Sequence, residues 1–168
     1  MYFVIYAFAG CEVCVMANTL ILGLGNPLRG DDGVGTAVIT TLQNEPLPPD
    51  VDVVDGGTAG LELVLLLQKY RRVLVVDAAE MGLAPGEWRR FDGNTAVLPT
   101  NPDHLNGTLH NAGFAQALTL AEALGTLPTE ITVFGVQPAM VDWSDGLSAA
   151  VETAVLPVCQ AVLGALGE

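Results

Sequence analysis

Basic residues are scarce in this chain. Of its 168 residues, six are Lys or Arg and nineteen are Asp or Glu, which gives a net charge of −13. Nucleic-acid binding relies on lysines and arginines that displace counterions from phosphates, so this composition disfavours nucleic acid as a partner. The acidic balance suits a cationic protein partner or metal ions, and it is also compatible with a role in solubility alone.

Cysteines are few as well. Cys11 and Cys14 form C-E-V-C, a spacing used by redox and zinc sites, but no second pair is present to complete a four-ligand zinc site. Both precede Met16, in a segment without the basic region of a signal peptide. We interpret residues 1–15 as a non-native start or a dispensable extension, and residues 16–168 as a single domain.

The chain also lacks a long uninterrupted apolar run. No stretch reaches the ~18–20 residues needed to span a bilayer without a charge or a glycine. We therefore expect no membrane partner and a cytoplasmic protein. Apolar residues nevertheless make up 51% of the chain and charged residues only 15%, a balance typical of a globular protein with a large core.

Short apolar runs alternate with helical patterns along the chain. Most of these runs are rich in Val, Ile and Leu without polar alternation, which is typical of parallel strands covered on both faces. We predict an α/β fold, a three-layer sandwich with a mostly parallel twisted sheet of about five strands covered by helices on both faces. The expected strands are 19–25, 51–55, 71–78, 86–93 and 130–138, and the expected helices are 31–43, 58–70, 110–124 and 146–167.

Three details refine this prediction. The alternating run 86–93 indicates a half-exposed edge strand. Thr58 is a suitable N-cap for the second helix, and Pro157 is expected to kink the last one. Cys159 is expected in the core on the apolar side of that last helix.

Polar residues follow several of the expected strands directly. Ligands bind beyond the carboxyl ends of the strands in such sheets, so these residues are the candidates for a site. They are Asn26 to Asp32, Asp55 to Thr58, Asp77 and Gln137.

The stretch "GLGNPLRGDDGVG" after the first strand allows more than one interpretation. A dinucleotide-binding fingerprint would need a third glycine where Leu28 stands, and Asp31 and Asp32 would repel a pyrophosphate, although Asp55 could mimic the ribose contact. "GLGNP" and "LHNAG" also resemble motifs of the peptidyl-tRNA hydrolases. In that family the second motif follows within a few residues, whereas here it comes some eighty residues later, and the acidic charge argues against tRNA.

The aspartates themselves favour a third interpretation. Asp32, Asp77 and a histidine from a later loop could converge as a metal site with open positions for water or substrate. Carboxylate and imidazole ligands together suit borderline divalent ions such as Ni²⁺ or Zn²⁺. The histidine must be neutral to bind, so affinity should fall as the pH drops through its pKa, about 6.5 if unperturbed.

Five motifs in order carry a family resemblance. "GLGNPLRGDDGVG", "DGGTAGLEL", "VLVVDA", "LHNAGFAQAL" and "FGVQP" resemble those of the hydrogenase maturation proteases, nickel-dependent endopeptidases that process the large subunit of [NiFe] hydrogenases. The resemblance covers about residues 19–166. It implies a phosphorylase/hydrolase-like fold and removal of a C-terminal extension from the large-subunit precursor after nickel insertion.

The resemblance also implies a site. Asp32, Asp77 and His110 match the family's metal-binding and catalytic positions, with nickel presented by the substrate and other divalent metals able to occupy the site in vitro. Some family members carry Glu at the position of Asp32, so either the loop with the shorter aspartate approaches more closely or the neighbouring Asp31 shares the task. His110 is preferred over His104 because it opens a helical pattern.

Simpler roles for the same residues stay open at this point. Asp32 alone would serve as a helix N-cap, and His110 as a cap or surface residue. The alternative functions are a non-proteolytic metal-binding chaperone or adaptor for a metalloenzyme precursor, and a peptidyl-tRNA-hydrolase-like hydrolase.

Overall fold

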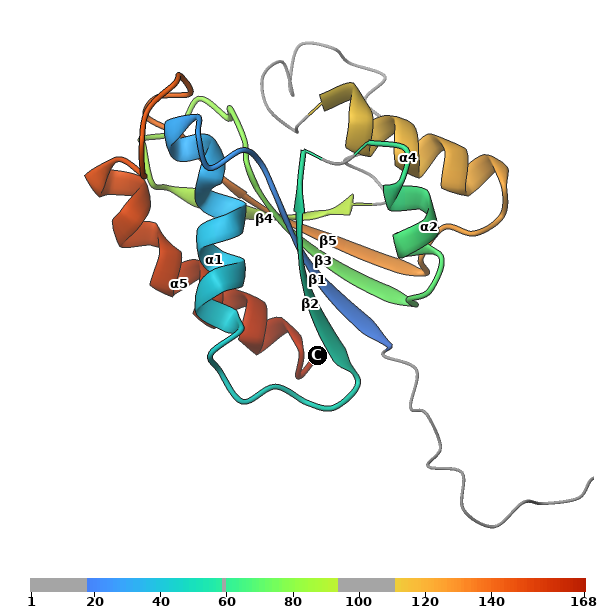
Figure 1. Ribbon diagram of the computed structural model, residues 1–168. Helices are drawn as coiled ribbons and strands as arrows, with labels where there is room; N and C mark the ends of the chain where they lie inside the picture. The colour runs from blue at the N-terminus through green and yellow to red at the C-terminus, as the bar shows by residue number, and fades with distance from the viewer. Residues whose placement is uncertain (1–17, 59, 94–110) are drawn as a thin grey trace, which may run out of the picture.

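The computed structural model describes residues 18–58, 60–93 and 111–168 (Figure 1). Within these ranges the strands and helices alternate as the sequence predicts. In chain order the elements are β1 (Thr19–Leu24), the 3-10 helix η1 (Gly30–Gly33), α1 (Val34–Leu42), β2 (Val51–Gly57), α2 (Leu63–Leu67), β3 (Arg72–Ala78), β4 (Trp88–Asp92), α4 (Asn111–Ala123), β5 (Glu130–Val136) and α5 (Ala149–Ala165).

The five strands form one sheet in the order β2-β1-β3-β5-β4. The first four are parallel, and β4 pairs antiparallel with β5 at the edge, as the alternating pattern of 86–93 predicts. The chain leaves β1 toward β2 on one side and later returns to β3 on the other side. This reversal is the topological switch point of the sheet, where open α/β sheets bind their ligands.

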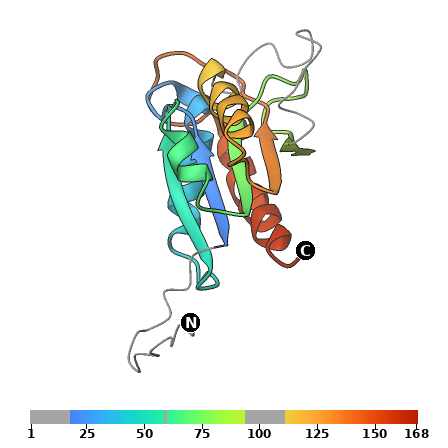
Figure 2. The ribbon, with the colours of Figure 1, turned by 90° about the vertical axis from the view of Figure 1, so that its right-hand side faces the viewer.

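Helices cover both faces of the sheet, which confirms the three-layer sandwich (Figures 1 and 2). Alternate residues of each central strand face opposite layers, because side chains in a strand alternate. The α1 and α5 face buries Ile21, Val38, Leu74, Val76, Phe134, Val158, Cys159 and Val162. The α2 and α4 face buries Leu20, Leu22, Leu63, Leu67, Val73, Val75, Phe114 and Leu118.

Helix α1 begins unusually close to the end of β1. A Cβ atom at Gly35 would overlap with the carbonyl oxygen of Leu24, and one at Gly23 would lie 2.6 Å from the carbonyl oxygen of Gly35. Only glycine at both positions permits this approach. The close contact fixes the short η1 segment against the carboxyl end of the sheet.

The second helix is shorter than predicted. Strand β2 stays paired with β1 as far as Gly57, and this places Thr58 in the following turn rather than at a helix N-cap. The helix α2 starts only at Leu63 and is not capped by a side chain. By contrast, α5 runs continuously through Pro157 and is capped by Ser148, whose Oγ accepts the N–H of Val151.

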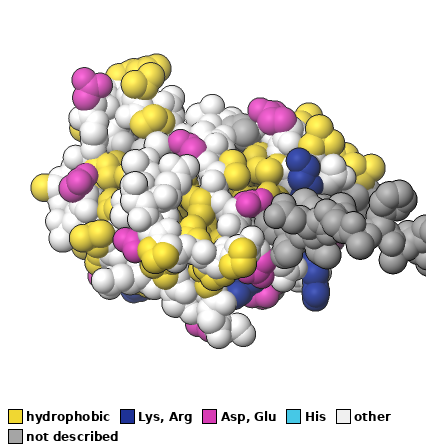
Figure 3. Space-filling model, turned by 60° about the horizontal axis from the view of Figure 1, so that its bottom comes forward, with side chains coloured by type: hydrophobic (Ala, Val, Ile, Leu, Met, Phe, Trp, Pro, Cys, Tyr) yellow, Lys and Arg dark blue, Asp and Glu magenta, His cyan; other side chains and the backbone are white. Residues whose placement is uncertain are grey.

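On one side of the molecule the acidic residues are dispersed rather than gathered (Figure 3). Figure 3 shows this on the side of the molecule that holds the loop between α1 and β2. Among the helices of the described segments, none combines the length and the apolar character that crossing a bilayer requires. The first 17 residues, including the proposed extension, lie outside the described residues.

One hydrogen bond ties the end of the α2 segment to the edge strand β2. The Tyr70 hydroxyl donates to Asp52 Oδ2 at 2.7 Å. Burial, reinforced by this hydrogen bond and by the charge of Asp52, raises the pKa of Tyr70 to about 12. The unfolded chain releases the same proton near pH 10.

We therefore expect Tyr70 to make folding pH-dependent above pH 10. The folded state holds the proton more tightly, so its stability is complete below about pH 10 and is lost as the pH rises toward about 12. Denaturant unfolding at pH 9 and pH 11 should show this loss in the wild type and less of it in Tyr70→Phe. An absorbance titration in which Tyr70→Phe leaves the highest tyrosine step unchanged would contradict the assignment.

Candidate active site

Two buried aspartates, from different segments of the chain, lie at the switch point of the sheet. Asp32 lies in η1, which follows β1 and contacts β3, and Asp77 is the penultimate residue of β3. Both side chains are fully buried. The structure therefore brings Asp32 and Asp77 to the same edge of the sheet, where the carboxyl ends of β1 and β3 lie side by side.

The loop after β1 folds tightly around Asp32. Its Oδ2 accepts the backbone N–H of Asn26 at 2.9 Å, and the Asn26 side chain in turn accepts the N–H of Leu28. Gly25 has a φ of +120°, and a Cβ there would overlap with the Asp32 carbonyl oxygen. Asn26 thus contacts Asp32 through its backbone.

Asp77 is placed by the alternation of β3. Val73 and Val75 face the layer of α2 and α4, so Asp77, two residues further on, points toward that same layer. The chain enters α4 at Asn111, directly after His110 in the sequence. His110 and His104 both lie outside the described residues.

Burying carboxylates is costly unless donors or a cation stabilise their charge. Two of them at one sheet edge supply the hard oxygen ligands that a divalent cation prefers, and an imidazole would extend the set toward nickel or zinc. Within residues 18–58, 60–93 and 111–168, no group of three potential metal ligands is assembled. A complete set of three metal ligands would therefore need one residue from outside these ranges. The predicted ligand His110 is such a residue.

Asp31 has a different role from the one expected of it. Its Oδ1 accepts the N–H of Ser148 at 2.6 Å, while its Oδ2 accepts the N–H groups of Ala139 and Met140 and the Ser148 hydroxyl at 2.7–3.1 Å. Both carboxylate oxygens are therefore committed within the protein. Of the two alternatives for the shorter Asp32 side chain, these hydrogen bonds disfavour sharing by Asp31, because its oxygens already hold the loop between β5 and α5.

Two further strand ends carry structural polar groups. Asp55 accepts the Thr36 hydroxyl of α1 and the N–H of Gly57, so it holds the end of β2 against α1. Gln137 is buried after β5, where its Oε1 accepts the N–H groups of Met81 and Leu83. Their positions after strands made both residues candidates for the site. Their hydrogen-bond partners show that they stabilise the local backbone instead.

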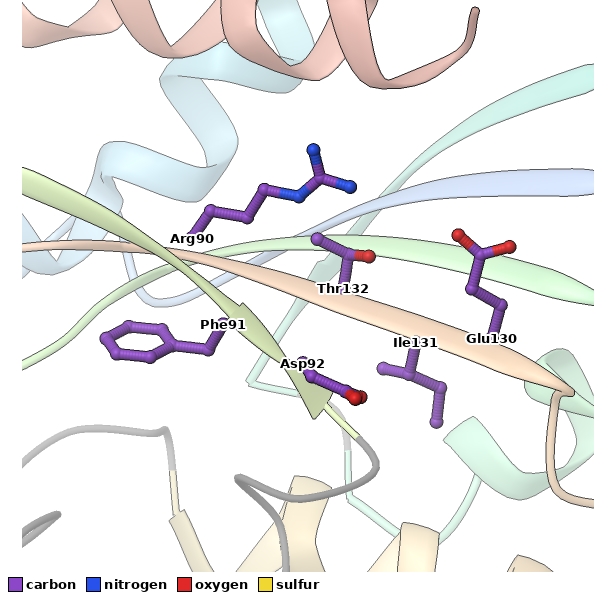
Figure 4. Close-up of a pocket in the computed structure, with 6 residues that line it drawn as sticks. All are labelled: Arg90, Phe91, Asp92, Glu130, Ile131 and Thr132. Carbon is purple, nitrogen blue, oxygen red and sulfur yellow. The ribbon is translucent and has the colours of Figure 1, made fainter. Parts of the chain in front are cut away.

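A separate cavity of about 420 Å³ lies away from these aspartates, on strands β4 and β5 (Figure 4). The Arg90 guanidinium projects to the opposite side from Phe91 in this view. The lining residues are Arg90, Phe91, Asp92, Glu130, Ile131 and Thr132. Neither Asp32 nor Asp77 contributes to it, so the cavity is distinct from the candidate site.

Fold and site together define a doubly wound α/β protein that carries buried carboxylates at its switch point. A family model described as hydrogenase maturation protease matches residues 36–165. The hydrogenase expression/formation protein HupD of Rhizobium leguminosarum bv. viciae is 34% identical over 146 residues, which cover 81% of this chain and 71% of HupD. The hydrogenase 2 maturation protease of Escherichia coli is 32% identical over 89% of this chain and 90% of its own.

Solved structures agree with these sequence relationships. The hydrogenase maturating endopeptidase HybD from E. coli superposes with a TM-score of 0.79 at 32% identity, covering 89% of this chain and 91% of HybD. A hydrogenase 2 maturation peptidase from a Thaumarchaeota archaeon gives a TM-score of 0.68 at 34% identity, with coverages of 89% and 98%.

The chain therefore belongs to the hydrogenase maturation protease family. It is a hydrogenase maturation endopeptidase, and thus a hydrolase. This confirms the resemblance drawn from the five sequence motifs. Nothing in these comparisons favours a dinucleotide-binding protein, a peptidyl-tRNA hydrolase or a non-proteolytic chaperone.

We expect Asp31→Asn to destabilise the fold. An amide cannot accept four hydrogen bonds as the carboxylate does, and a buried donor left unpaired costs about 1–3 kcal/mol, so the free energy of unfolding should fall by about 2 kcal/mol or more. Asp142→Asn is the matched control, since Asp142 is exposed in the β5–α5 loop that Asp31 fastens and should change stability by no more than about 0.5 kcal/mol. Equal stability of the two variants in urea unfolding would contradict this role.

Proposed function

We propose that this protein removes the C-terminal extension of the [NiFe] hydrogenase large-subunit precursor after nickel insertion. The observation that carries the proposal is the burial of Asp32 and Asp77, from two separate segments, at the switch point of a hydrogenase maturation protease fold. Relatives named as maturation proteases for hydrogenase support the kind of substrate.

We further propose that Asp32, Asp77 and His110 recognise nickel already held by the precursor. Carboxylate and imidazole ligands together suit this ion. Nickel is then part of the substrate, and recognition reports that loading is complete. A bound divalent ion would polarise the scissile carbonyl or lower the pKa of a water, and a carboxylate would serve as general base.

His110 is supported by its place in the chain. It directly precedes α4, and α4 packs on the sheet face toward which Asp77 points. Phe114, one helical turn into α4, is buried in the same cluster as Val75 of β3. A histidine that opens this helix is therefore a suitable third ligand.

Single replacement of the three residues should abolish processing. Asp32→Asn, Asp77→Asn and His110→Ala each remove a ligand charge or donor, and we expect the mass of the nickel-loaded large subunit to stay unchanged after incubation. Asp32→Glu keeps the ligand type and should retain part of the activity. Full processing by any of the first three variants would remove that residue from the site.

Folding controls accompany this test. Each variant should keep the wild-type circular dichroism spectrum, so that loss of processing reports on the site. A wild-type protein that binds the precursor without changing its mass would favour the chaperone or adaptor alternative instead.

Nickel-free precursor should remain uncut. The proposed site recognises the ion on the substrate, so without nickel the contact between the precursor's ion and the site is missing and productive binding is lost. Mass spectrometry of precursor prepared with and without nickel measures the difference, with zinc-loaded precursor as a third sample. Efficient cleavage of the metal-free precursor would overturn the proposed nickel checkpoint.

A further inference from the structure

Three large apolar side chains are exposed on two loops beside the candidate site. Leu28 lies between β1 and η1 and is 57% exposed, while Met140 and Trp143 lie between β5 and α5 and are 52% and 74% exposed. We call these three residues the apolar rim. Figures 1 and 2 show the β5–α5 loop passing over the start of α1, at the carboxyl end of the sheet.

The two loops of the apolar rim are fastened to each other. The Ser144 N–H donates to the Leu28 carbonyl, the Gly30 N–H donates to the Ser144 carbonyl, and the Asp31 N–H donates to the Met140 carbonyl, all at 3.1–3.2 Å. The Asp31 carboxylate adds the buried bonds to Ala139, Met140 and Ser148 described above. The backbone that carries the exposed side chains is therefore held in place before any partner arrives, which lowers the entropy lost on binding.

The charge around the apolar rim is mainly acidic. Asp142 and Asp145 are exposed on either side of Trp143 and Ser144 in the β5–α5 loop, and Arg29 is the basic residue of the two loops. A complementary partner would thus present an apolar stretch with lysine or arginine beside it. Tryptophan is among the residue types that most often dominate the binding energy of an interface.

The apolar rim is continuous with the candidate site. Leu28 and Asp32 both lie in the short connection between β1 and α1, and Asp31, the residue before Asp32, fastens the second loop. A segment seated on the apolar rim would therefore lie next to Asp32. Two equally exposed leucines, Leu124 after α4 and Leu156 on α5, share none of these bonds.

We propose that the apolar rim docks an apolar segment of the hydrogenase large-subunit precursor that is flanked by basic residues. The proposal rests on the proposed function, because it takes that precursor as the partner. Docking there orients the precursor so that its metal and scissile bond face Asp32 and Asp77. The apolar rim contributes to binding and takes no part in bond cleavage.

Kinetics and direct binding together test this proposal. With nickel-loaded precursor, Trp143→Ala should raise both KM and the calorimetric Kd by about tenfold, the size expected for a central interface residue, and leave kcat nearly unchanged. Leu28→Ala and Met140→Ala should act in the same direction. Leu124→Ala and Leu156→Ala, at 60% and 63% exposure, are the matched controls and should change neither constant.

The electrostatic part of the proposed docking is tested by the salt dependence of Kd. Asp145→Asn should raise Kd at low ionic strength, and the difference from wild type should shrink in 0.5 M salt because exposed charges are screened. A basic flank on the precursor predicts this salt dependence, and an equal Kd at low salt would overturn that part of the proposal.

The outcomes separate the docking proposal from the proposed function. Wild-type cleavage with unchanged KM and Kd in all three rim variants would overturn docking at the apolar rim and leave the protease function standing. Tight wild-type binding without cleavage would overturn the function, while the Kd values of the variants would still decide on the apolar rim. A wild-type protein that neither binds nor cuts the precursor would overturn both.

Discussion

The buried carboxylate of Asp31 holds together the functional end of this molecule. It accepts three backbone N–H groups and the Ser148 hydroxyl, so one side chain joins the loop after β1 to the loop after β5 and to the first turn of α5. A charged group without contact with water must be fully hydrogen bonded, and this requirement fixes where each donor lies. The positions of Asp32 and of the apolar rim both depend on that arrangement.

The two adjacent aspartates illustrate how partners determine a role. The Asp31 carboxylate accepts hydrogen bonds from the protein's own backbone. Asp32 lies at the switch point, at the same sheet edge as Asp77, and accepts the N–H of Asn26. One residue of sequence thus separates a structural carboxylate from a candidate metal ligand. A substitution at either position is expected to lower activity. At Asp31 the cause would be a destabilised fold, and at Asp32 it would be the loss of a candidate metal ligand.

The fold shares its geometry with dinucleotide-binding proteins but reverses the charge at the binding end. Gly23 and Gly35 let α1 approach β1 closely, as a phosphate-binding turn would require. Buried carboxylates then occupy the edge where a pyrophosphate would bind. This combination suits a ligand that is positively charged, and the proposed nickel-loaded substrate satisfies that condition.

Much of the architecture was predictable from the sequence, because local patterns are sufficient for it. The unbroken apolar runs of β1, β3 and β5 indicate buried parallel strands, the alternation in 86–93 indicates an edge, and the motifs indicate the family. Asp32 and Asp77 were predicted from their positions after or near strand ends. Tertiary structure alone decided that Thr58 is not a cap, that Asp31 fastens α5, and that Leu28 lies beside the loop of Met140 and Trp143. Those facts depend on contacts between residues more than a hundred positions apart, or on strand pairing, and neither leaves a signal in local periodicity.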